Sequence, residues 1–336
     1  MRRQFLGLSF ALLILFLSIS PGEIVAAPYY EGKTIRIVVG LPPGGGYDRM
    51  ARILSRHLPK YIPGKPTILI ENMPGAASMI ATNYLYNLAK PDGLAFGTFN
   101  RGIIAAQLQK VEGARFDMMK FSWIGSAAVE PTLLALRSDS PYKTFEDIRK
   151  AKEEIKIGAV GPGDSTYNLA ILLKEFLGLN LRIVTGYPSS TEIALAVERR
   201  EVLGMTFAYS SVKPFIERGL VRPLLRTRIS KPGIEHLPVD QDLTTDKMGK
   251  TLLTMLSVAD RVGRPYVAPP KTRAEIMNIL KDAFARVAKD PELKEESTKL
   301  MMDVDYTPAD ECLKELHYFF NQPANIVSEF NKYIKF

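Results

Sequence analysis

The chain has 336 residues, enough for about two domains with a sizeable core. Hydrophobic residues make up 46% and charged residues 24%, which excludes a disordered, collagen-like or coiled-coil chain. The only cysteine, Cys312, can close no intramolecular disulfide and build no cysteine-ligated zinc or iron–sulfur site. Because His57, His236 and His317 lie far apart, we expect no metal site and no cofactor.

The net charge is +8, from 44 Lys and Arg against 36 Asp and Glu. These charges are scattered rather than gathered in blocks, which favours a solvated basic surface over a nucleic-acid-binding face. We therefore expect no nucleic-acid partner. A positive balance would also help to attract small anions.

Residues 1–27 have the features of a secretory signal peptide. Arg2 and Arg3 precede an apolar run over residues 6–19, and Ala26 and Ala27 are small residues at the expected cleavage point. The apolar run is shorter than the ~20 residues that a membrane span needs. The sequence predicts a protein exported to the periplasm, cleaved near Ala27, whose mature chain starts near Pro28.

In chain order, β-branched runs alternate with apolar residues at helical spacing. The first series predicts strands at 34–39, 67–71 and 94–99, with a helix from 48 and another through 84–88. Strands then follow near 123–126 and 132–136. This alternation predicts an α/β protein with mainly parallel sheets flanked by helices.

A second series predicts strands at 155–158, 182–185, 203–208 and 221–226, with helices at 167–177, 190–199 and 213–219. Residues 230–250 are turn-rich and predict a linker or surface excursion. We then expect a strand at 252–258 and two amphipathic helices. The last helix would open at Thr307 and Pro308, a capping residue followed by proline in the first turn.

Glycine-rich and hydroxyl-rich loops follow several of the predicted strands. Pro42-Pro43-Gly44-Gly45-Gly46 lies between a strand and a helix, where its backbone N–H groups can face an anion beside the positive end of the helix. No Gly-Lys-Ser/Thr follows, so this is not a nucleotide P-loop. Tight turns and plain helix capping would explain the same residues. Three further loops have this character: Gly75–Ser78, Gly161–Thr166 and Tyr187–Thr191.

Catalytic motifs are missing from the sequence: it has no G-x-S-x-G elbow, no H-E-x-x-H helix and no EF-hand loop. We expect Glu295 and Glu296 to be solvated charges on a helix surface. We expect Cys312 to be a packed, inert thiol. Arg101, just after the third strand, suits either a surface position or pairing with a second carboxylate of a ligand.

Six sequence blocks occur in an order that is typical of one known family: Ile35–Asp48, Glu71–Ser78, Lys90–Gly93, Gly158–Thr166, Gly186–Ser190 and Val267–Pro270. Through these blocks the sequence resembles the solute-binding receptors of tripartite tricarboxylate transporters, also called Bug-type periplasmic receptors, over essentially the whole mature chain. It departs from the common pattern at Asn168, at Tyr187–Ser190 and around Leu203-Gly204.

The resemblance implies a two-lobed, type II-like periplasmic binding protein fold with a ligand cleft between the lobes. Residues 28–128 would form the first part of lobe 1, residues 129–251 lobe 2, and residues 252–336 a return to lobe 1 with C-terminal helices. It also implies a small carboxylic acid as ligand. The implied ligand-binding residues are Gly44, Gly45, Gly46, Tyr47, Asp48, Ala76, Ala77, Ser78, Ser165, Thr166 and Tyr187.

The leading hypothesis is a monomeric, non-enzymatic receptor that closes over a small organic acid and offers it to membrane transporter subunits. Presentation of the ligand to a sensor protein is a variant that the sequence does not separate. The alternative is an exported enzyme acting on small carboxylic acids, with Asp48, Tyr47 and Tyr187 as acid–base candidates. A third hypothesis is a basic adhesin or nucleic-acid binder, which would show a steep salt dependence.

Overall fold

The computed structural model describes residues 27–335. The predicted signal peptide lies outside these residues, except for Ala27. Within the described part of the chain, no helix is long and apolar enough to cross a membrane.

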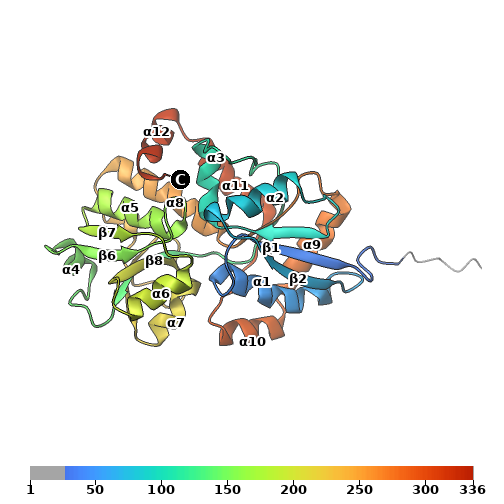
Figure 1. The fold of residues 1–336 in the computed structure, drawn as a ribbon, viewed down its shortest axis with the longest axis horizontal. Helices are drawn as coiled ribbons and strands as arrows, with labels where there is room; N and C mark the ends of the chain where they lie inside the picture. The colour runs from blue at the N-terminus through green and yellow to red at the C-terminus, as the bar shows by residue number, and fades with distance from the viewer. Residues whose placement is uncertain (1–26, 336) are drawn as a thin grey trace, which may run out of the picture.

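Two β-sheets lie in separate halves of the molecule, each flanked by helices (Figure 1). The first sheet has the strand order β11 (Thr307–Pro308), β4 (Ser122–Ser126), β10 (Pro265–Ala268), β3 (Ala95–Thr98), β1 (Thr34–Val39) and β2 (Thr67–Asn72). The second has the order β7 (Leu181–Val184), β6 (Ile155–Gly158), β8 (Gly204–Ala208), β5 (Thr132–Arg137) and β9 (Val221–Arg226).

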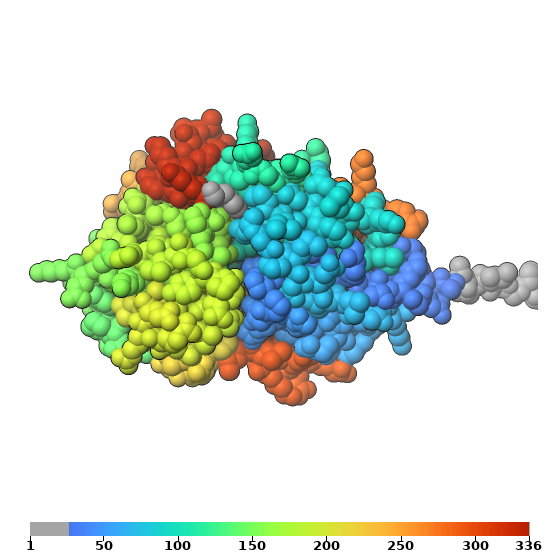
Figure 2. Space-filling view, viewed as in Figure 1, coloured from blue at the N-terminus to red at the C-terminus, as the bar shows by residue number. Residues whose placement is uncertain are grey.

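The helices alternate with the strands as the sequence predicts for most of the chain. In order they are α1 (Gly46–His57), α2 (Met79–Asn87), α3 (Ile104–Leu108), α4 (Phe145–Arg149), α5 (Ser165–Leu177), α6 (Ser190–Glu198), α7 (Tyr209–Glu217), α8 (Lys247–Val262), α9 (Ala274–Val287), α10 (Pro291–Lys299), α11 (Ala309–Phe320) and α12 (Ala324–Tyr333). In the space-filling view the blue and yellow-green segments meet along a seam across the molecule, beneath the red C-terminal segment (Figure 2).

The predicted two-lobed α/β architecture is confirmed, but both sheets are mixed, and the prediction of mainly parallel sheets is wrong. β1 pairs parallel with β2 and β3, and β6 pairs parallel with β7 and β8. β10 runs antiparallel to β3 and β4, and β5 runs antiparallel to β8 and β9. Antiparallel strands occur where the chain passes from one sheet to the other. β5 is the first strand after the chain crosses to the second sheet at residues 127–131, and β10 is the first strand after the chain returns to the first sheet through α8. The lobe boundaries proposed above remain a prediction.

The apolar core follows from the alternation of side chains along the strands. On β1, Ile35 and Ile37 join a cluster on one face of the first sheet, and Val38 joins a cluster on the other face. That second cluster continues into the other half of the molecule through Leu252 and Val258 of α8. One continuous apolar core therefore ties the two sheets together.

The predicted strand at 252–258 is wrong, because these residues belong to α8. Leu252, Met255 and Val258 are buried at helical spacing, and the side chain of Asp246 caps the helix by accepting from the Gly249 N–H at 2.6 Å. α8 also begins inside the predicted linker at 230–250. A β-branched or apolar run of this length fits a strand as well as a helix. The aspartate just before the run is the sequence signal that favours a helix.

The C-terminal prediction also needs correction, because four helices follow β10 instead of two. Thr307 does not cap a helix: with Pro308 it forms the short edge strand β11, paired antiparallel with β4. The last helix, α12, lies against α5 and α8, where the rings of Tyr333 and Phe176 are 4.9 Å apart. A proline-containing turn is compatible with an edge strand as well as with a helix start.

Candidate functional site

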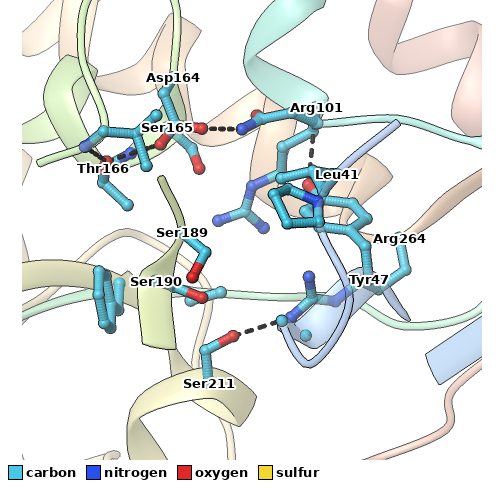
Figure 3. A pocket seen from close by; sticks show the side chains of 17 residues that line it. Leu41, Tyr47, Arg101, Asp164, Ser165, Thr166, Ser189, Ser190, Ser211 and Arg264 are labelled. Atoms are coloured by element: carbon cyan, nitrogen blue, oxygen red, sulfur yellow. Dashed lines mark hydrogen bonds between the residues drawn. The ribbon is translucent and has the colours of Figure 1, made fainter. Parts of the chain in front are cut away.

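A cavity of about 530 Å³, including its part open to solvent, lies between residues of the two halves. Leu41, Tyr47, Arg101 and Arg264 line one side of it in the close-up view, opposite the serines of α6 and α7 (Figure 3). The lining residues are Leu41, Pro42, Gly45, Gly46, Tyr47, Asn100, Arg101, Val160, Asp164, Ser165, Thr166, Ser189, Ser190, Phe207, Ala208, Ser211 and Arg264.

The N-termini of four helices meet at this cavity. α1, α5, α6 and α7 each follow a strand, and the first residues of each, or the residue just before them, belong to the lining. The first turn of a helix leaves backbone N–H groups without helical partners and carries the positive end of the helix dipole. A cavity surrounded by such ends is suited to an anion.

The start of α1 has no side-chain cap. Its N-cap residue is Gly45, and Gly44 before it has φ +86°, a conformation that favours glycine. A Cβ on Gly46 would lie 2.5 Å from Arg264 Nη2 and 2.6 Å from Ser211 Oγ, so this position has no room for a side chain. A Cβ on Gly45 would lie 3.9 Å from Ser190 Oγ, which places the start of α6 opposite the start of α1.

The start of α5 is closed by an aspartate of the chain itself. Asp164 accepts hydrogen bonds from the Thr166 N–H at 2.8 Å and from Thr166 Oγ1 at 2.6 Å. The side-chain amide of Asn100, from the other half of the molecule, donates to the same carboxyl group. Burial raises the pKa of Asp164, and the hydrogen bonds from Thr166 and the charge of Arg101 oppose that rise only in part.

The start of α7 is closed by Glu130. Its carboxylate accepts from the Ser210 N–H at 3.2 Å and from Ser210 Oγ at 2.5 Å. Burial alone would raise the pKa of Glu130, but the Arg264 guanidinium and the hydrogen bonds from Ser210 outweigh it and lower the pKa. Glu130 is therefore ionised, and it neutralises both this helix end and Arg264.

Two buried arginines are held beside the cavity by carboxylates of the chain. Arg101 lies 2.7 Å from Asp260, and Arg264 Nε lies 3.2 Å from Glu130. The Arg264 guanidinium also lies over the ring of Tyr47, 4.3 Å from its centroid. A surface position for Arg101 is wrong: its side chain is 2% exposed, and the carboxylate it pairs with is Asp260.

Five of the predicted site residues line the cavity: Gly45, Gly46, Tyr47, Ser165 and Thr166. The other six lie outside the lining: Gly44, Asp48, Ala76, Ala77, Ser78 and Tyr187. Asp48 and Tyr187, two of the acid–base candidates of the enzyme hypothesis, are thus not at the cavity surface. The hydroxyl of the third, Tyr47, accepts a hydrogen bond from the Arg101 N–H at 3.0 Å.

Asp48 and Ser78 do not line the cavity, but their side chains hold the backbone of the loops around it. Asp48 accepts from the Gly44 N–H at 2.9 Å and pairs with Arg52 at 2.8 Å. Burial alone would raise the pKa of Asp48, but the hydrogen bonds from Arg52, Gly44 and Asn72 outweigh burial, so that the pKa is lowered overall.

Ser78 is buried, donates to the Gly40 carbonyl at 2.9 Å and accepts from the Asn100 N–H at 2.9 Å. It therefore connects the loop after β2 to Asn100. Tyr187 packs on a different apolar cluster, on the face of the second sheet that α6 and α7 cover. Burial raises the pKa of its hydroxyl.

Sequence reasoning named the loops but missed several lining residues. Asp164, Ser189 and Ser190 lie inside loops that the sequence singles out, next to residues that were chosen. Arg264 precedes β10 and has no motif around it, so only the fold places it in the cavity.

One group of side chains could hold a metal ion among the described residues: His57, Asp290 and Glu292, away from the cavity. The Lys60 ammonium already bonds to both carboxylates, at 3.4 Å to Asp290 and more closely to Glu292. Glu296, expected as free surface charge, pairs with Arg56 and lies 2.6 Å from His57 Nε2. An internal cation thus satisfies this acidic group.

Two mixed sheets with helix N-termini from both halves around one cavity define the class of two-lobed solute-binding proteins. The family model "Tripartite tricarboxylate transporter family receptor" matches residues 50–331. The chain belongs to this family of solute-binding receptors.

Individual relatives agree with this assignment. The UPF0065 protein in the gbd 5' region of Cupriavidus necator is 25% identical over 91% of this chain and 90% of its own. The periplasmic binding protein BugD has a TM-score of 0.73 at 20% identity, over 91% of this chain and 99% of its own. MatC from Rhodopseudomonas palustris, solved with bound malate, has a TM-score of 0.70 at 20% identity, over 88% and 99%. At this identity the solved structures show the shared fold.

Proposed function

We propose that this receptor captures a small organic carboxylate in the cavity and delivers it to a membrane transporter of the tripartite tricarboxylate class. The observation that carries the proposal is the uncapped start of α1, which faces the start of α6 across the cavity. Backbone N–H groups at such a start bind a carboxylate without a metal or a cofactor.

The ligand carboxylate would accept hydrogen bonds from the N–H groups of Gly46 and Tyr47. Hydroxyl groups of Ser165 and Ser190 would reach it from the opposite wall, where Figure 3 shows both serines. Gly44, Asp48 and Ser78 would act indirectly, by holding the loops in place.

Binding would select the closed arrangement of the two lobes. Hydrogen bonds already cross the cavity: Thr191 Oγ1 donates to the Gly44 carbonyl at 3.4 Å, and Asn100 donates to Asp164. A ligand touching both walls adds to these contacts only when the lobes are together. The crossing at residues 127–131 and the return between α8 and β10 are the natural hinge.

The cellular setting follows from the N-terminal segment and the family. We propose export to the periplasm with cleavage near Ala27, and action there as a monomer that meets the transporter subunits. MatC, whose structure holds malate, supports a carboxylic acid as ligand.

A thermal-shift panel of mono-, di- and tricarboxylates, aromatic acids and amino acids on the purified protein tests the proposal. An acid at about a hundred times its Kd should add ~2.7 kcal/mol to the free energy of unfolding. Gly45→Asp, which puts a carboxylate at the start of α1, should abolish the shift. Gly45→Ala, which adds an uncharged methyl group in ordinary contact with the Pro42 carbonyl and Ser190 Oγ, each at 3.9 Å, is the matched control and should keep it.

No shift with any acid, after unfolding and refolding to remove retained ligand, would contradict the receptor proposal. Conversion of an acid to a product would favour the enzyme hypothesis instead.

A further inference from the structure

The charged side chains around the cavity already balance one another. Of the described lining residues, Arg101, Arg264 and Asp164 are of charged types. Asp260 pairs with Arg101, and Glu130 pairs with Arg264. Each of these four partners is at least 96% buried, so neither arginine can exchange its partner for water. With Asp260 and Glu130 ionised by their arginine partners, the walls are neutral when Asp164 is protonated and carry one negative charge when it is ionised.

The remaining positive potential comes from helix ends that no carboxylate within residues 27–335 closes. These are the starts of α1 and α6, since Asp164 closes α5 and Glu130 closes α7. The start of α6 is capped by a neutral group, the Ser189 hydroxyl, which accepts from the Glu192 N–H at 3.4 Å. Asp48, in the first turn of α1, is paired with Arg52. The N-terminal end of a helix dipole is equivalent to at most roughly half a positive charge. Two such ends therefore favour no more than the single negative charge of one carboxylate.

A second carboxylate on the ligand would find no unpaired cation among the described residues that line the cavity. Arg49 is the next cation along α1, but it does not line the cavity and its guanidinium donates to the Leu300 carbonyl. The second group would lie near Asp164 or Glu130, where like charges repel at low local dielectric. The rest of the lining is uncharged: it combines apolar side chains with the polar groups of Tyr47, Asn100, Thr166 and four serines. The apolar side chains are those of Leu41, Pro42, Val160, Phe207 and Ala208.

We propose that this receptor selects small monocarboxylates with an uncharged body and discriminates against di- and tricarboxylates. The inference rests on the proposed function, and it names the ligand class for the same cavity. The discrimination comes from Glu130 and Asp164, which occupy two of the four anion positions that the fold provides. The expected ligand class therefore differs from the malate found in MatC.

Calorimetric titration with acids of matched length tests this selection in the wild-type protein. The pairs are butyrate and succinate, hexanoate and adipate, and benzoate and terephthalate. We expect measurable binding of the monoacid in at least one pair, with a Kd about tenfold or more below that of its diacid, since like-charge juxtaposition in a binding site costs several kcal/mol.

A variant of Glu130 tests the mechanism. Glu130→Gln keeps an amide oxygen that can accept from Ser210 but removes the charge that neutralises Arg264. The Arg264 guanidinium then becomes available to a second ligand carboxylate, and the diacid of the binding pair should gain about tenfold in affinity. Glu146→Gln, at an exposed ion pair with Arg149 on α4, is the matched control and should change neither Kd.

The outcomes separate the two proposals. A diacid that binds wild-type protein as tightly as its monoacid, or more tightly, overturns the selection and leaves the receptor function standing. Absence of binding for all six acids overturns the receptor function itself. If Glu130→Gln fails to fold, the wild-type comparison still decides the selection, and a folded variant with unchanged diacid affinity overturns the role of Glu130.

Discussion

The starts of α1 and α5 show one structural unit used in two ways. Both helices follow a strand and a glycine-containing loop, and both point their N-termini at the same cavity. α1 begins after Gly45, and no side chain caps its first N–H groups. α5 begins after Asp164, whose side chain accepts a hydrogen bond from the Thr166 N–H in the first turn of α5. The fold supplies several anion positions, and single residues decide which of them stay open to a ligand.

The largest effect is expected where the open end is blocked. Gly46→Val would place its Cβ 2.5 Å from Arg264 Nη2, and the buried pairing of Arg264 with Glu130 prevents an easy retreat. Overpacking of this kind lowers the free energy of unfolding by about 1–3 kcal/mol. Because the strain is relieved by moving the start of α1, whose N–H groups would bind the carboxylate, we also expect the affinity for the acid to fall roughly tenfold or more. Calorimetry would measure it, with Gly45→Ala as the control. Wild-type affinity in Gly46→Val would show that the start of α1 is not the binding position.

A smaller effect is expected when the closed end is opened. Asp164→Ala removes the cap of α5 and should lower the free energy of unfolding by about 1 kcal/mol, measured by urea unfolding. It also leaves the buried Asn100 amide without its partner.

Asp246→Ala, which removes the cap of α8 away from the cavity, is the matched control. Both variants should lose stability, but only Asp164→Ala should change ligand affinity. Equal affinity in the two variants would contradict a role for Asp164 at the cavity.

The smallest effect concerns the loop that precedes α1. The pKa of Asp48 is lowered in the folded protein, so its stabilising contribution is complete above the unfolded pKa near 4 and is lost as the pH falls through the lower folded value. Asp48→Asn should therefore be less stable than wild type at pH 6, and the gap should narrow towards pH 3. Urea unfolding across this range measures it, and a gap that stays constant with pH would contradict the ionic role.

Sequence reasoning anticipated the strand–loop–helix units and the loops that meet at the cavity, because β-branched runs, glycine loops and helical spacing are local signals. It failed for α8, whose apolar run fits a strand as well as a helix. It also failed for Arg264, because the position of this side chain depends on the long-range meeting of β10 with α7 and α1. Asp48 and Ser78 lie in the right loops, but packing turns their side chains away from the cavity.

An amide-detected NMR titration of the ¹⁵N-labelled protein with the tightest-binding monocarboxylate tests the central claim most directly. The account predicts one-to-one saturation, with the largest shifts at the backbone N–H groups of Gly46, Tyr47 and Ser190. Stoichiometric binding that leaves these amides unmoved and shifts others would contradict it, because the carboxylate would then lie elsewhere than at the starts of α1 and α6.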